Sequence, residues 1–120
     1  MKIVRESKQP VAALDLHCPY ARGGSQNGSI YFAGQEDKAT QAAQDRLSGI
    51  LEDVDGGLPY KRANNVSFGT NWNVPSNYKS GMSFAHWCAR QDKDTIAMTL
   101  EILYAEASGA EVTPERLRTF

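Results

Sequence analysis

Residues 36–54 form a long amphipathic segment whose apolar side chains repeat with the period of an α-helix. One helix face collects Ala39, Ala42, Ala43, Leu47, Ile50, Leu51 and Val54. Glu36 and Asp37 stand in the first turn, where carboxylates suit the positive end of a helix, and Gly56-Gly57 ends it. Short apolar runs flank this helix on both sides. Because strands then alternate with helices, the sequence predicts the α/β fold class, with a mixed β-sheet and flanking helices.

Four short segments are predicted to be strands: residues 11–16, 30–33, 65–70 and 95–104. The first is a continuous apolar run between Pro10 and Pro19, which is typical of a buried strand in the centre of a sheet. In the last, the alternation of side chains places Glu101 on the same face as Thr99.

The segments between these strands carry loop and helix-capping signals. Residues 21–29 are rich in glycine, serine and asparagine, and residues 71–81 are polar, so both are predicted to be loops. Ser83 is a predicted cap for a short helix that continues through Gln91. Thr113-Pro114-Glu115 is typical of a helix start, with threonine as the cap and proline at the first helical position.

Length and composition narrow the class of protein. The 120 residues correspond to one domain or to a large piece of one. The net charge is −1 and the basic residues are scattered, which argues against a nucleic-acid partner. The sequence contains no apolar run of about 18 residues, so a membrane is not an expected partner either. Cys18 and Cys88 are too few for a disulfide framework and are interpreted as two free thiols or one disulfide. The sequence assigns no cellular compartment.

Two side chains stand at positions where metal binding or catalysis is expected. His17 ends the first predicted strand, and ligands bind at the strand ends of α/β sheets. A neutral imidazole there is a suitable zinc ligand, although a hydrogen-bonded structural histidine is the alternative. Glu101 stands in the most apolar strand, where a buried carboxylate needs a partner or a function. Beside a metal-bound water it can act as general base; alternatively, it pairs with an arginine such as Arg22 or lies at a sheet edge.

Asp15 and Tyr78 are further candidates. Asp15 lies two residues before His17, so in a strand both side chains share one face. Asp15 can therefore orient a neighbouring group, or it is simply a buried, hydrogen-bonded aspartate. Tyr78 lies in the predicted loop 71–81, where a mobile tyrosine can close over a substrate and donate a hydrogen bond. The alternative for Tyr78 is a half-exposed loop aromatic.

The two histidines each stand close to a cysteine, in His17-Cys18 and His86-Trp87-Cys88. A structural zinc site made from these four side chains is conceivable, but the spacings match no standard zinc motif. A cysteine nucleophile, Cys18 or Cys88, is a further alternative. Because neighbours in a strand point to opposite faces, His17 is badly placed to activate Cys18.

Taken in order, these segments resemble the C-terminal half of the zinc carboxypeptidases of the carboxypeptidase A type. Asp15-Leu16-His17 is similar to the strand-ending Asp-x-His motif of that family, residues 78–87 to its loop-tyrosine stretch, and Thr99-Leu100-Glu101 to its Thr-x-Glu motif. The resemblance implies that His17 binds zinc and that Glu101 is the general base. It also implies that Tyr78 contacts a peptide or amide substrate. The implied fold is part of a zinc-carboxypeptidase-like (phosphorylase/hydrolase-like) fold.

The family supplies its other two zinc ligands from a His-x-x-Glu motif, which these 120 residues do not contain. His17 is followed by Cys18-Pro19-Tyr20 and His86 by Trp87-Cys88-Ala89. We therefore interpret residues 1–120 as a single domain or the C-terminal portion of a carboxypeptidase-like catalytic domain. By itself the chain is expected to show little or no activity and to form a homo-oligomer through exposed sheet surfaces. The alternative is a non-catalytic α/β interaction or structural module in which His17 and Glu101 are buried and satisfied.

Overall fold

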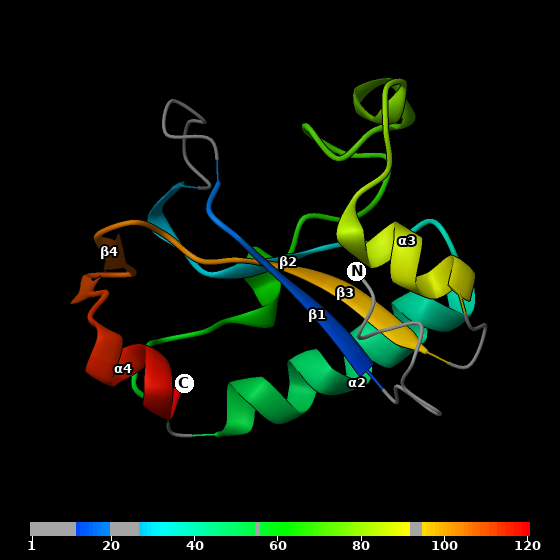
Figure 1. The fold of residues 1–120 in the computed structure, drawn as a ribbon. Helices are drawn as coiled ribbons and strands as arrows, with labels where there is room; N and C mark the ends of the chain where they lie inside the picture. The colour runs from blue at the N-terminus through cyan, green and yellow to red at the C-terminus, as the bar shows by residue number, and fades with distance from the viewer. Residues whose placement is uncertain (1–11, 20–26, 55, 92–94) are drawn as a thin grey trace.

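The structure is a computed structural model that describes residues 12–19, 27–54, 56–91 and 95–120. At its centre is a three-stranded sheet in the order β1-β3-β2, made of β1 (Ala12–His17), β2 (Tyr31–Ala33) and β3 (Ile96–Glu101) (Figure 1). β1 runs parallel to β3, whereas β2 runs antiparallel to it. The longest helices are α2 (Lys38–Asp53) and α3 (Phe84–Gln91). The predicted α/β class with a mixed sheet is therefore confirmed.

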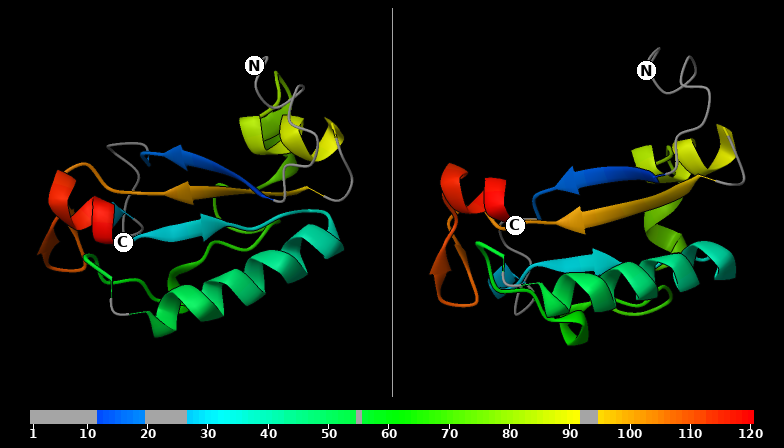
Figure 2. Two further views of the ribbon diagram at one scale, coloured as in Figure 1. Left: turned by 60° about the horizontal axis from the view of Figure 1, so that its bottom comes forward. Right: turned by 90° about the horizontal axis from the view of Figure 1, so that it is seen from below.

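The two helices lie on opposite faces of the sheet (Figure 2). Leu47 of α2 packs on the larger apolar core, which contains Phe32 and Leu100. Cys88 of α3 packs against Ala97 in a smaller cluster on the other face. Side chains of β3 thus alternate between two cores, as the sequence predicts. None of the helices among the described residues is long and apolar enough to span a membrane.

β1 lies at an edge of the sheet, so the prediction of a central, buried strand at residues 11–16 is wrong. The central strand is β3, and within the described residues β1 pairs with β3 alone. Leu14 and Leu16 are 47% and 61% exposed and border an apolar groove. An apolar run identifies a strand, but it does not specify which neighbours cover it. Residue 11 and most of the predicted loop 21–29 lie outside the described residues.

α2 begins and ends within two residues of the predicted bounds, but it buries only part of the predicted apolar face. Asp37 is the N-cap, where its side chain accepts a hydrogen bond from the Thr40 amide at 2.7 Å. Ile50 and Val54, predicted to lie on the apolar face, are 63% and 53% exposed. The fully buried positions include two polar residues, Gln44 and Ser48. Helical periodicity therefore located the helix but only part of its packed face.

Residues 65–70 do not form a strand, which corrects that prediction. Val66 joins the sheet through one isolated parallel bridge to Ala33, held by its amide donating to Phe32 and its carbonyl accepting from Gly34. The chain then turns away, because Gly69 has a φ of +86°. Short 3₁₀ helices, η2 (Arg62–Asn64) and η3 (Pro75–Tyr78), flank this segment.

The C-terminal part follows the predictions more closely. β3 ends at Glu101, three residues before the predicted end, and the chain continues into a small hairpin of β4 (Glu106–Ala107) and β5 (Ala110–Glu111). The hairpin was not predicted. The final helix, α4 (Pro114–Thr119), begins at the predicted cap, because Thr113 Oγ1 accepts a hydrogen bond from the Arg116 amide at 3.3 Å.

Candidate active site

The ends of β1 and β3 bring His17 and Glu101 side by side. The two strands pair in parallel register, with His17 opposite Glu101 and Asp15 opposite Thr99. By alternation from Ala97, these side chains project to the face of the sheet that α3 covers. The predicted zinc ligand and the predicted general base are therefore neighbours at the ends of β1 and β3.

Asp15 holds the imidazole of His17. His17 Nε2 lies 3.2 Å from Asp15 Oδ1, and the two side chains are 54% and 10% exposed. The predicted orienting role of Asp15 agrees with this contact. Because Nε2 faces Asp15, Nδ1 is the ring nitrogen that remains for a metal ion. His17 is exposed, so it is not the buried histidine of the alternative interpretation.

Glu101 is a buried carboxylate in the central strand, only 6% exposed. A position at a sheet edge is therefore ruled out, and Arg22 lies outside the described residues. Oε2 of Glu101 has no hydrogen-bond partner in the part of the chain that the structure describes. Burial raises the pKa of this carboxyl above its ordinary value, with His17 opposing the rise and Asp15 adding to it. Such a carboxylate is a better proton acceptor than an exposed one.

Tyr78 is held by a buried asparagine, although the sequence predicted a mobile tyrosine. Its hydroxyl donates to Asn73 Oδ1 at 2.7 Å. Asn73 is 1% exposed, and its Nδ2 donates to the carbonyls of Gly34 at 2.9 Å and Val66 at 3.2 Å. Burial, and then the charge of Glu101, raise the pKa of the Tyr78 phenol. The sequence did not reveal this anchoring, because Asn73 and Tyr78 both lie within residues 71–81, whose polar composition predicts only a loop.

One cavity of about 100 Å³ unites the three predicted site residues, His17, Tyr78 and Glu101. This volume has room for about three water molecules or one small functional group. Its lining comes from β1, β2, β3 and residues 34–35 and 72–86: His17, Ala33, Gly34, Gln35, Trp72, Tyr78, Ser83, His86, Thr99 and Glu101. Larger cavities lie elsewhere in the molecule, but they do not contain Glu101.

Near Glu101, Tyr31 was missed as a site candidate, and His86 was considered only as a ligand of a four-residue zinc site. Tyr31 pairs with Glu101 in antiparallel register, and burial followed by the charge of Glu101 raises its pKa to about 12. His86 lines the cavity, and its ring meets that of Tyr78 edge-on at 5.5 Å. Ser83 Oγ lies 2.9 Å from His86 Nδ1. The sequence predicted Ser83 as a helix cap. The register of β2 with β3 and the contact between the rings of Tyr78 and His86 have no local signal in the sequence.

The structure does not agree with a Cys88 nucleophile or with a zinc site made of the two histidines and two cysteines, whereas a Cys18 nucleophile stays a prediction. Cys18 is exposed, whereas Cys88 is buried in the cluster beneath α3. Burial, and then the charge of Asp15, raise the pKa of the Cys88 thiol, which is the opposite of an activated thiolate. Among the described residues no three His, Cys, Asp or Glu side chains are grouped so that they could hold a metal ion. A zinc site made of His17, Cys18, His86 and Cys88 is thus not formed.

No protein-family model, no curated protein and no solved structure matches this chain.

Proposed function

We propose that this chain supplies the general base and one zinc ligand of a carboxypeptidase A-like zinc hydrolase that cleaves a peptide or amide bond. One observation carries the proposal. His17, Tyr78 and Glu101 were selected from three separate sequence motifs, and they line the same small cavity. Unrelated residues spread over 85 positions have no reason to meet at one strand end, where α/β proteins bind ligands.

The described residues fit zinc as one part of a site. His17 offers Nδ1, and its Nε2 is held by a carboxylate, as in many zinc-bound histidines. A catalytic zinc has about three protein ligands, and no group of three is present in the described part of the chain. We infer that the other ligands come from a His-x-x-Glu segment outside these 120 residues, in a zinc-carboxypeptidase-like fold. When bound, zinc supplies a Lewis acid that activates water for attack on a carbonyl.

Glu101 moves the proton. Its raised pKa brings it closer to neutral pH, where a general base is most efficient. It accepts a proton within the cavity and later returns it to the leaving amine. Tyr78 lies within reach of the same space, and it contacts a substrate by exchanging its hydrogen bond with Asn73.

We expect the isolated chain to show little or no carboxypeptidase turnover, with or without added zinc. The physical reason is that a single imidazole does not hold a catalytic zinc ion. Hydrolysis of a chromogenic C-terminal peptide substrate, measured with the purified chain, checks this. Robust turnover that is lost in Glu101→Ala would show that the site is complete and the partial-site proposal wrong.

The exposed apolar groove leads to a prediction about assembly. The groove has a volume of about 720 Å³ and joins the exposed Leu14 and Leu16 of β1 to Leu47 and Leu51 of α2. An uncovered apolar face next to an edge strand favours self-association. We expect a dimer or larger assembly by light scattering, which Leu16→Lys shifts toward monomer. The matched exposed control is Ile50→Lys, because Ile50 is 63% exposed on α2 and does not line the groove. A monomeric wild-type chain would contradict the expectation.

A non-catalytic α/β module is the second candidate function. It is favoured by the hydrogen bond that occupies the Tyr78 hydroxyl and by the lack of a three-ligand group among the described residues. In that case, replacing Glu101 by glutamine leaves all binding and activity of a longer protein unchanged. In the proposed hydrolase the same change lowers kcat by a factor of about 10²–10⁴.

A further inference from the structure

The buried side of α2 carries an amide whose hydrogen-bonding groups are unmet. Gln44 is 0% exposed, and neither its Nε2 nor its Oε1 has a hydrogen-bond partner within the described part of the chain. Burial of an amide without partners is unfavourable, and native proteins rarely leave both groups unmet. These two groups match a molecule that supplies an acceptor for Nε2 and a donor for Oε1.

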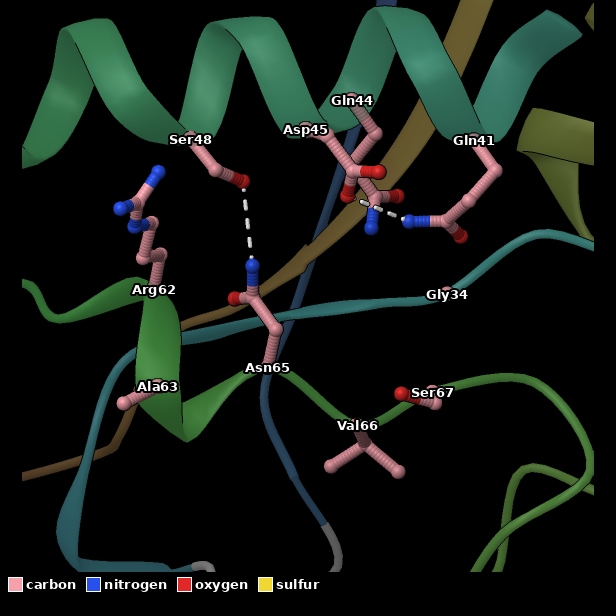
Figure 3. A pocket seen from close by; sticks show the side chains of 10 residues that line it. All are labelled: Gly34, Gln41, Gln44, Asp45, Ser48, Arg62, Ala63, Asn65, Val66 and Ser67. Atoms are coloured by element: carbon pink, nitrogen blue, oxygen red, sulfur yellow. Dashed lines mark hydrogen bonds between the residues drawn. The ribbon is translucent and has the colours of Figure 1, made fainter.

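Gln44 lies on the wall of a polar cavity of about 510 Å³ between α2 and residues 62–67 (Figure 3). Figure 3 shows its side chain extending from α2 toward the segment that carries Gly34, with Arg62 toward one end of the cavity. The far wall is ordered by Asn65, whose Nδ2 donates to Ser48 Oγ at 3.0 Å. This cavity shares only Gly34 with the cavity of His17 and Glu101, so the two are separate.

We propose that this cavity binds a small molecule carrying a primary carboxamide and a carboxylate. A primary carboxamide presents an N–H and a C=O on one edge, which matches the edge of Gln44. A trans peptide unit points these two groups in opposite directions and so matches less well. No aromatic side chain is among the residues that line the cavity, so a nucleobase has no stacking surface.

In this proposal, the guanidinium of Arg62 binds the carboxylate of the ligand. Its side chain is 65% exposed, and its Nε lies 3.2 Å from Glu52 Oε2. Contact through Nε leaves the two terminal nitrogens of the guanidinium for a ligand, in the fork geometry that suits a carboxylate. The carboxamide end thus lies at Gln44 and the anionic end at Arg62.

Access to Gln44 requires a side-chain movement. Gln41 and Asp45 flank it on α2 and are joined by an exposed hydrogen bond of 2.7 Å between Gln41 Nε2 and Asp45 Oδ1. Exposed pairs four residues apart on a helix are weak, so this bond opens easily. The ligand amide then reaches Gln44 and pairs with both of its unmet groups.

The test is a titration of the folded chain with glutaramate, the monoamide of glutaric acid, followed by NMR. Pentanoate and pentanamide are matched probes that lack the carboxamide and the carboxylate, respectively. We expect glutaramate to bind at least about tenfold more tightly than either, because each lacks one hydrogen-bonded group. Gln44→Leu, which keeps the shape and removes the amide, should lose glutaramate binding by a similar factor.

Arg62→Gln provides a second variant at an exposed position if Gln44→Leu does not fold. It should weaken glutaramate binding and leave pentanamide binding unchanged. His17→Ala should alter neither, because the site is independent of the proposed hydrolase function. Failure of glutaramate to bind the wild-type chain, or equal binding by wild type and Gln44→Leu or Arg62→Gln, would overturn the proposal and leave solvent as the partner of Gln44.

Discussion

Glu101→Gln is expected to make the folded chain more stable at pH 8, by about 1–2 kcal/mol, because it removes a buried charge with an unmet oxygen. The pKa of Glu101 is raised in the folded state above the ordinary value of 4.5. The folded state therefore binds this proton more tightly than the unfolded state does. The stability that Glu101 contributes is present below pH 4.5 and is lost as the pH rises through the raised pKa.

The measurement is urea unfolding of both proteins between pH 4 and pH 8. The difference in unfolding free energy should be small at pH 4 and should grow toward pH 8. Glu36→Gln is the matched control, because Glu36 is exposed just before α2 and its change should stay within about 0.5 kcal/mol. If Glu101→Gln destabilises the fold at pH 8, the carboxylate is paired in the native state and the proposed base is a structural residue.

Gly34→Ala is expected to destabilise the fold by about 2–3 kcal/mol. A Cβ at this position would lie 2.7 Å from the Phe68 amide nitrogen and 3.0 Å from the Val66 carbonyl oxygen, both backbone atoms. The Gly34 amide also donates to Val66 at 2.7 Å, so neither segment can withdraw without losing a hydrogen bond. Because Gly34 lines the His17 cavity, the substitution should disturb the candidate site as well.

Gly49→Ala is the matched control for this prediction. Gly49 lies within α2, and the nearest atom to an added Cβ is the flexible tip of Arg62 at 4.0 Å. Alanine should therefore stabilise the helix by about 1 kcal/mol. Chemical denaturation of the three proteins measures both effects. Equal stability of Gly34→Ala and wild type would mean that the segment at Val66 is not packed against β2.

Local signals in the sequence predicted the helices well. α2 has a cap residue and a strong period, and α4 has Thr113 and Pro114 at its start, so both are determined by nearby residues. Strand 65–70 was a wrong prediction, because Val66 forms only one bridge before the chain turns at Gly69. The edge position of β1 depends on which distant segments pair, and periodicity contains no information about that.

The candidate site likewise contains residues that the sequence identified and residues that only the tertiary structure reveals. The resemblance selected His17, Tyr78 and Glu101, and the structure places them around one cavity. The contribution of Tyr31 depends on the antiparallel register of β2 with β3, which no local pattern specifies. The sequence did not identify Gln44 as a candidate binding residue, because a glutamine in a helix is ordinarily exposed and only tertiary packing buries it.

The most direct test of the proposed hydrolase site is a zinc titration of the chain with imidazole nitrogen shifts as the readout. The chain contains two histidines, so His86 serves as an internal reference for His17. We predict weak binding that changes the Nδ1 shift of His17, is lost in His17→Gln and persists in His86→Gln. Zinc that leaves the His17 nitrogens unchanged, or that binds His17→Gln as well as wild type, would contradict the account.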